Sequence, residues 1–290
     1  MQVGVAFPQT EIGSDPIVIR DFAQAVEEMG YDHLTAIDHV LGERTPSGPA
    51  HAKFYTRDRM FHEPLMLFAF LAAHTSSLEF TTAILIMAQR QTALIAKQVA
   101  ELDVLSGGRV RLGVGIGWNE CEFEALGMNF RDRVRRSEEQ VEVLRKLWSE
   151  DLVTFHGEWH TLNDVGINPV PIQRPIPVWF GAFQAPAIRR LAKIGDGWLL
   201  NPRLPATDEG RAEIEMMWGF AEEFGRDPAD IGLEATVLAE SGGSQEWAAE
   251  AAIWQDYGCS HVTFRTLDCG LESIDDHLEA MRRFSEAIPR

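Results

Sequence analysis

The chain has 290 residues, of which 45% are hydrophobic and 24% charged, and its formal net charge is −18. This length can bury a large core, and it allows either one large α/β barrel or two smaller domains. The strong negative charge argues against general nucleic-acid binding, which needs a basic surface.

The cysteine usage and the hydropathy pattern indicate a cytoplasmic protein. The three cysteines, Cys121, Cys259 and Cys269, form no C-x-x-C pair, so we expect free thiols in a reducing compartment. The chain enters an apolar run at Val3 with no basic segment before it, so no secretory signal is expected. No apolar run reaches the roughly 20 residues that span a bilayer, and we expect no membrane contact.

Short apolar runs alternate with amphipathic helices through the first half of the chain. The predicted strands are residues 2–9, 31–40, 78–87 and 110–117, and the predicted helices are residues 16–29, 64–75 and 92–105. Residues 41–63 interrupt this rhythm with Gly, Pro and charged residues, over a length unusual for a connection. Their basic side chains (Arg44, Lys53, Arg57 and Arg59) indicate a lid in so acidic a protein, although a solvated loop explains them equally well.

The second half repeats the rhythm after a predicted helix over residues 120–150 and a hairpin-like insertion over 152–175. The predicted strands are residues 176–183, 197–201, 233–240 and 261–267, and the predicted helices are residues 185–194, 208–224, 245–257 and 274–288. Eight strands alternating with helices predict an α/β protein with a (β/α)₈ TIM barrel. We expect residues 1–290 to form a single barrel domain, with insertions after the second strand and before the fifth; a doubly wound open sheet is the alternative.

The fourth strand is the most informative stretch. Gly107-Gly108 ends the preceding helix, and Val110, Leu112, Val114 and Ile116 then alternate with Arg111, Gly113, Gly115 and Gly117. Glycine inside a strand often means that another group comes close to the backbone, so a flat ligand could lie on this face. The alternative is a buried strand with glycines for packing. A dinucleotide fingerprint is excluded by spacing, because Trp118 stands where the third glycine is required.

In a barrel the chemistry lies at the C-terminal ends of the strands. Asp38-His39 is the most polar of these ends, and a histidine there can move a proton, although a helix cap and a solvated side chain would look the same. Gly181-Ala182-Phe183 precedes a helix directly and suits a phosphate, or is an ordinary turn. The predicted lining of a substrate pocket is taken from other strand ends, namely Phe7, Trp118, Asn201 and Arg265.

Two other kinds of site are not expected. His39, His51, His62 and Glu63 are close in sequence but lack the spacing of metal ligands, so no metal is expected. The G-x-S-x-G nucleophile elbow is absent.

The residues of the central stretch and its flanks resemble the luciferase-like monooxygenase family. The segments that carry the resemblance are Ala96-Lys97-Gln98, Leu102–Arg109, Leu112–Trp118, Glu122-Phe123, Leu126-Gly127, Phe130, Ile37-Asp38-His39, Pro177–Ala182 and Gly195–Trp198. The resemblance covers nearly the whole chain. It implies a barrel with an insertion, often dimeric, that binds a flavin or the deazaflavin coenzyme F-420 at the strand ends.

Within that family the Asp-His pair resembles the deazaflavin-dependent members. The resemblance then implies that Asp38 and His39 lie near the redox ring, with His39 as the proton handler. It also implies a non-proline cis peptide at Ala83–Ile84 behind the ring, with Gly115 and Gly117 leaving room for the ring or for a side chain. Gly181, Ala182 and Phe183 would hold the phosphate, although relatives usually have two glycines at Gly181-Ala182.

Three functions follow from the resemblance. The first is hydride transfer between coenzyme F-420 and a small apolar substrate held by Trp118 and Phe7; Trp118 replaces the acid found in the sugar-phosphate branch. The second is a monooxygenase that receives reduced FMN from a partner reductase and reacts with oxygen. The third is a non-catalytic flavin-binding relative, which would not need His39. A homodimer and a flavin or deazaflavin reductase are the expected protein partners.

Overall fold

The computed structural model describes residues 1–45 and 49–288, and in them nine parallel strands form one closed sheet. In chain order these strands are β1 (Gln2–Ala6), β2 (His33–Ala36), β3 (Glu79–Thr82), β4 (Leu85–Ile86), β5 (Val110–Gly115), β8 (Val178–Gly181), β9 (Gly197–Leu199), β10 (Gly232–Leu238) and β11 (His261–Arg265). Neighbours in the sheet follow the chain order, β1 pairs with β11, and β3 pairs with β5, so the ring closes. β3 and β4 are two halves of one strand, and the predicted eight-stranded TIM barrel is confirmed.

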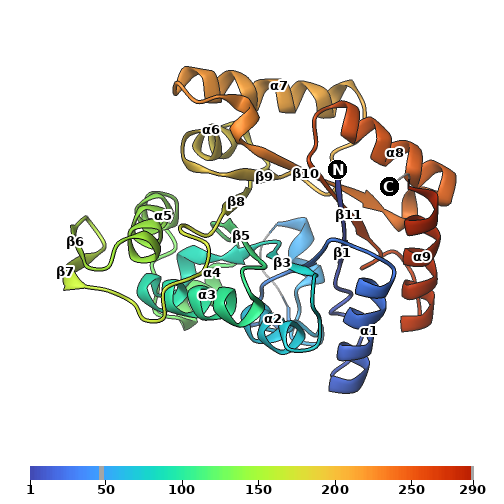
Figure 1. Ribbon diagram of the computed structural model, residues 1–290, viewed down its shortest axis with the longest axis horizontal. Coiled ribbons are helices and arrows are strands. Elements are labelled where there is room, and N and C mark those ends of the chain that lie inside the picture. The colour runs from blue at the N-terminus through green and yellow to red at the C-terminus, as the bar shows by residue number, and fades with distance from the viewer. Residues whose placement is uncertain (46–48, 289–290) are drawn as a thin grey trace.

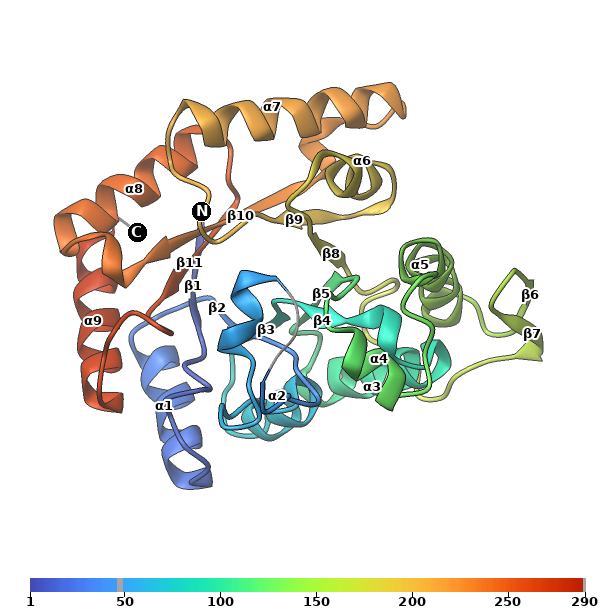
Figure 2. The same ribbon diagram turned by 180° about the vertical axis from the view of Figure 1, so that it is seen from behind.

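Helices surround the strands on every side (Figures 1 and 2). They are α1 (Pro16–Glu28), α2 (Pro64–Ala72), α3 (Thr92–Ser106), α4 (Glu120–Ala125), α5 (Arg133–Ser149), α6 (Ala185–Ile194), α7 (Asp208–Glu223), α8 (Ser244–Asp256) and α9 (Ile274–Ala287). None of the helices in the described part of the chain is both long and apolar enough to cross a membrane.

The sequence around β5 folds as its pattern predicts. Gly107 ends α3 with a left-handed φ of 73°, a conformation that glycine adopts without a side-chain penalty. Val110, Leu112 and Val114 are all buried in the core beneath the helices. Arg111, on the alternate face, points into the barrel, where its Nη1 lies 2.5 Å from Oε2 of Glu234.

A layer of buried polar side chains lies inside the barrel, beneath the C-terminal ends of the strands. Glu234 accepts hydrogen bonds from Arg111 and, at 2.5 Å, from the Thr263 hydroxyl, and its Oε1 lies 3.3 Å from Nε2 of His33. Burial alone would raise the pKa of Glu234, but Arg111 and His33 outweigh burial and hold that pKa well below its ordinary range. Removing one member of this cluster would leave another charge buried without its partner. We therefore expect such a change to destabilise the folded protein.

Both predicted insertions are present. The hairpin before the fifth barrel strand is β6 (Val153–His156) paired antiparallel with β7 (Thr161–Val165), at the far end of the molecule from α8 and α9 (Figure 1). The first insertion, residues 41–63, is irregular except for a 3₁₀ turn (Ala50–Phe54); its residues 46–48 lie outside the described part of the chain.

The helix predicted over residues 120–150 is wrong as a single element. It is two helices, α4 and α5, because Gly127 takes a φ of 70° after the cap at Leu126. The third strand, predicted over residues 78–87, is likewise split into β3 and β4 by the peptide between Ala83 and Ile84.

Candidate active site

The break in the third strand carries the cis peptide bond expected at Ala83–Ile84. The backbone N–H of Ala83 donates to the carbonyl of Ala36 on β2 (2.7 Å), and the Thr82 hydroxyl donates to the carbonyl of Gly113 on β5 (2.7 Å). Both neighbouring strands therefore hold the break in place at the C-terminal end of the barrel, where barrel enzymes carry their chemistry.

The Ile84 side chain occupies the space that Gly115 of β5 and Gly181 of β8 leave open. A Cβ atom added at Gly115 would lie 2.4 Å from Cδ1 of Ile84, and one at Gly181 would lie 2.9 Å from its Cγ2. At Gly117 the corresponding space is filled by Ile86 and Phe123. Of the two expected occupants, a ring or a side chain, the structure places side chains here: Gly115 makes room for Ile84, and Gly117 for Ile86 and Phe123.

A cavity of about 620 Å³, part of it open to solvent, lies at this C-terminal end of the barrel, and we call it the mouth cavity. Its walls are mainly apolar, and its floor is the upper part of the polar layer. The lining residues used below are Phe7, Ile37, Ala83, Ile84, Gly181, Phe183, Leu199, Glu234, Thr263 and Arg265. Of the predicted pocket residues, Phe7 and Arg265 line this cavity, as does Phe183, whereas Trp118 and Asn201 do not.

Asp38 is buried, and its carboxylate is bound by the protein itself. Oδ2 accepts a hydrogen bond from the backbone N–H of Ile86 (2.9 Å), and Oδ1 accepts one from Nη2 of Arg90 (2.6 Å). Arg90 also binds Glu63 at 2.9 Å. Burial raises the pKa of Asp38, and Arg90 and the Ile86 N–H offset only part of that rise. The structure thus makes Asp38 a positioning residue, which ties β2 to the segment after the cis bond.

His39 lies beside a second buried carboxylate, that of Glu122 at the start of α4. Nδ1 of His39 is 3.2 Å from Oε2 of Glu122, while Oε1 accepts from the backbone N–H groups of Val40 (2.7 Å) and Leu41 (3.0 Å). Burial raises the pKa of Glu122, but His39 and the two N–H groups outweigh it and hold the pKa of Glu122 below its ordinary value. Glu122 therefore stays ionised and favours the tautomer of His39 with its proton on Nδ1.

Aromatic rings from the first insertion and from the loop after β5 cover His39. Its ring centroid lies 4.2 Å from that of Tyr55, 5.1 Å from that of Phe61 and 5.8 Å from that of Trp118. Among the described residues, Nε2 of His39 has no hydrogen-bond partner. With Nδ1 turned to Glu122, Nε2 is the nitrogen that can exchange a proton.

The first insertion is tied to the barrel by ion pairs. Arg59 binds Asp268 in the loop after β11, and Glu63 binds Arg90. Arg57, by contrast, forms an exposed pair with its neighbour Asp58. Of the predicted basic residues of this segment, Arg59 therefore attaches the segment to the barrel, whereas Arg57 lies on the solvated surface.

The remaining predicted residues lie around the ends of β8 and β9. Ala182 is buried, and its carbonyl accepts from Nε1 of Trp198 (2.9 Å). Phe183 is 55% exposed at the rim of the cavity. Asn201 uses its side-chain oxygen to accept from the backbone N–H of Arg203, so it shapes the loop after β9.

Four residues of the site were not predicted: Glu122, Arg90, Tyr55 and Phe61. Glu122 contacts His39 from a distant part of the sequence, so no local sequence pattern predicts this pair. Within residues 1–45 and 49–288, no cluster of three or more His, Cys, Asp or Glu side chains could hold a metal ion; the side chain of His51 is not described. The three cysteines are free thiols.

The barrel, the interrupted third strand and the carboxylate–histidine pair at its mouth define an α/β-barrel oxidoreductase. The profile of the luciferase-like monooxygenase family matches residues 1–284, and the chain belongs to that family of enzymes.

Relatives within the family use different coenzymes. An FMNH₂-dependent dimethylsulfone monooxygenase of Pseudomonas putida is 30% identical over 239 residues, which are 81% of this chain and 61% of the relative. An F420-dependent hydroxymycolic acid dehydrogenase of Mycobacterium tuberculosis is 28% identical over 257 residues, 87% of this chain and 66% of the relative. A solved F420-dependent secondary alcohol dehydrogenase superimposes with a TM-score of 0.79 at 18% identity, over 99% of this chain and 98% of that one, and shares the fold.

Proposed function

We propose that the protein transfers a hydride between deazaflavin coenzyme F-420 and a small, apolar organic substrate. The observation that carries this proposal is the Glu122–His39 pair at the barrel mouth, since a carboxylate that fixes one imidazole nitrogen leaves the other to handle a proton. The likeness to the F420-dependent hydroxymycolic acid dehydrogenase supports the choice of coenzyme.

The residues present fit a flat, partly apolar ring with a phosphorylated tail. Ala83 and Ile84 form one wall of the mouth cavity, and its other walls are largely apolar. The turn Gly181-Ala182-Phe183 leads into α6, and a helix start suits a phosphate. In this first turn Pro186 has no N–H and Ala187 donates to the Gln184 carbonyl, which leaves the N–H of Ala185 available among the groups that the structure describes. When bound, the coenzyme would supply the hydride-transfer chemistry, which no protein side chain offers.

The contribution of the chain itself is orientation, exclusion of water and proton transfer. Phe7, Ile37 and Phe183 offer apolar contacts to a small substrate, and Arg265 places a cation at the rim. Nε2 of His39 takes the hydroxyl proton when an alcohol is oxidised and returns it when a carbonyl is reduced. Holding the reactants together can supply effective molarities on the order of 10⁵ M or more.

A second candidate function is a two-component monooxygenase that uses reduced FMN and oxygen. It is favoured by the 30% identity to the FMNH₂-dependent dimethylsulfone monooxygenase. In that case a separate flavin reductase would be the protein partner, and the cavity would shield the reactive flavin from water.

A fluorescence titration of the purified protein with coenzyme F-420, and separately with oxidised and reduced FMN, distinguishes these functions. We expect F-420 to bind at least about tenfold more tightly than either form of FMN, a free-energy difference of about 1.4 kcal/mol. A preference for reduced FMN would contradict the deazaflavin assignment and support the monooxygenase. Binding of neither would contradict both.

A further inference from the structure

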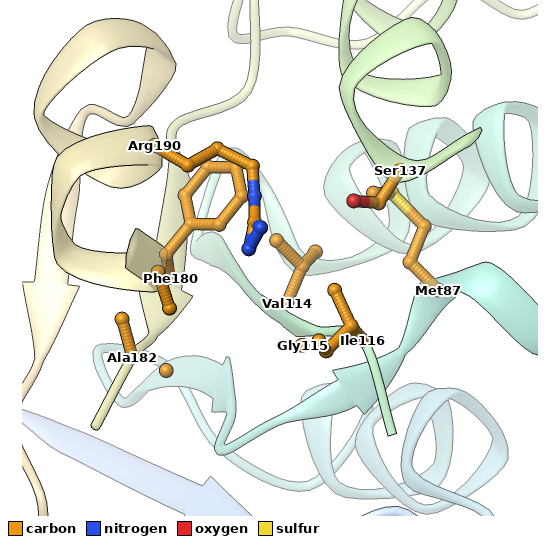
Figure 3. Close-up of a pocket in the computed structure, with 10 residues that line it drawn as sticks. Met87, Val114, Gly115, Ile116, Ser137, Phe180, Ala182 and Arg190 are labelled. Atoms are coloured by element: carbon orange, nitrogen blue, oxygen red, sulfur yellow. The ribbon is translucent and has the colours of Figure 1, made fainter. Parts of the chain in front are cut away.

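A second cavity lies behind the strand ends, on the helix side of the barrel. It has a volume of about 320 Å³, part of it open to solvent, between β5, β8, α5 and α6 (Figure 3). Gly181, at the end of β8, lines both this cavity and the one at the mouth.

Arg190 from α6 and Ser137 from α5 are the polar side chains of this otherwise apolar cavity. Figure 3 shows the Arg190 guanidinium directed inward past Phe180 and Val114, with the Ser137 hydroxyl on the opposite wall. The Arg190 side chain is only 10% exposed, and its one ion pair joins Nε to Oε1 of Glu138 at a long 3.8 Å. Ser137 is buried, and its hydroxyl donates to the carbonyl of Val134 (2.7 Å).

No hydrogen bond joins the Arg190 side chain to any other residue in the described part of the chain. A largely covered arginine side chain without hydrogen bonds is unusual, because desolvating a charge is costly unless a partner compensates for it. Burial also lowers the pKa of Arg190 below its ordinary value. Its neighbour Arg189 lacks this character, since it is 45% exposed, binds Glu223 and stacks over Phe220 and Phe224.

We propose that Arg190 binds the phosphate of the coenzyme tail in this second cavity. A guanidinium presents a planar set of donors that matches phosphate oxygens, and it loses less hydration than an ammonium would. The Ser137 hydroxyl can turn from the Val134 carbonyl to donate to the same anion. This inference rests on the proposed function, since it assumes a ligand whose ring occupies the mouth cavity, and it adds a charged residue that lies outside the turn at residues 181–183.

The test compares ligands with and without the phosphate, and in the FMN–riboflavin pair the phosphate is the sole difference. Binding of F-420 is set against binding of its dephosphorylated chromophore, and binding of FMN against binding of riboflavin, for the wild type and for the Arg190→Met variant. We expect Arg190→Met to weaken binding of the phosphorylated ligands by about 10–100-fold, as for loss of a charge-assisted hydrogen bond, and of the others by less than about twofold. Arg190→Lys should recover part of the loss.

Arg189→Met is the matched control, because it removes the same charge from the same helix without facing the cavity; it should bind every ligand as the wild type does. If Arg190→Met fails to fold, Arg190→Gln replaces it in the same comparison. An equal loss for both members of a pair, or no loss for either, would overturn the role of Arg190 while leaving the proposed function intact. A wild type that binds none of the four ligands would instead overturn the proposed function, and this inference with it.

Discussion

Replacement of Glu234 by Gln is expected to lower the midpoint of thermal unfolding by about 5–8 °C. The change leaves Arg111 buried next to a neutral amide, and removing one partner of a buried ion pair costs about 3–5 kcal/mol. For a chain of 290 residues each kcal/mol shifts the midpoint by about 1.6 °C. Arg111 keeps its second partner, Glu79 at 2.8 Å, so we expect a shift of the midpoint near the lower end of the predicted range. Calorimetry at pH 7 measures the shift.

Glu279→Gln is the control for this variant. Glu279 pairs with Arg282 at 2.6 Å, but both side chains are more than half exposed, so the loss should stay below about 1 kcal/mol. Equal shifts for the two variants would contradict the importance assigned to the buried layer.

The same layer makes the stability of the wild type sensitive to acid. The pKa of Glu234 in the folded protein lies well below the ordinary value of 4.5, so its contribution to stability is complete above 4.5 and is lost progressively as the pH falls from 4.5 through the lower folded value. Burial, together with Arg111 and His33, lowers the pKa of His261 from 6.5 to about 3. Between those two values the unfolded chain binds a proton at His261 that the folded chain does not, so stability also falls there with falling pH. The Glu234→Gln variant should keep the pH dependence that comes from His261 and lose the one that comes from Glu234.

Replacement of His39 by Ala is expected to lower kcat by about 10²–10⁴-fold while changing coenzyme affinity by less than about threefold. General acid–base catalysis contributes a factor of that size, and His39 is not among the residues that line the mouth cavity, so its loss should leave the contacts to a bound coenzyme there unchanged. The rate is followed as the change in deazaflavin absorbance with the best substrate from a panel of small alcohols and ketones.

Glu122→Gln separates proton transfer from simple packing. It preserves the shape of the side chain but replaces the charge that holds Nδ1 of His39, so it should lower kcat less than His39→Ala and should shift the pH profile of kcat. Unchanged turnover in His39→Ala would show that the proposed proton transfer is wrong.

The sequence predicted the barrel well because its patterns are local. The alternation along the fourth strand and the glycine at the end of α3 depend on neighbours in the chain. Both are found in the structure, although the strand ends at Gly115 and not at the predicted Gly117. The Asp38-His39 pair could be placed at the barrel mouth because parallel strands all end on one side.

The partners of those residues could not be predicted, because they come from distant segments. Glu122 and Arg90 look like ordinary charged residues of a polar helix and a short turn, and only the closed barrel brings them to His39 and Asp38. The glycines of β5 illustrate the same limit. Their spacing indicates a close approach, but it does not say that the group approaching Gly115 is Ile84 from the neighbouring strand.

The most direct test of the central proposal is a crystal structure of the protein soaked with coenzyme F-420. We predict the deazaflavin ring in the mouth cavity against Ala83 and Ile84, and the phosphate in the second cavity within hydrogen-bond distance of Arg190. A ring bound elsewhere on the barrel, or a mouth cavity that stays empty at saturating F-420, would contradict it.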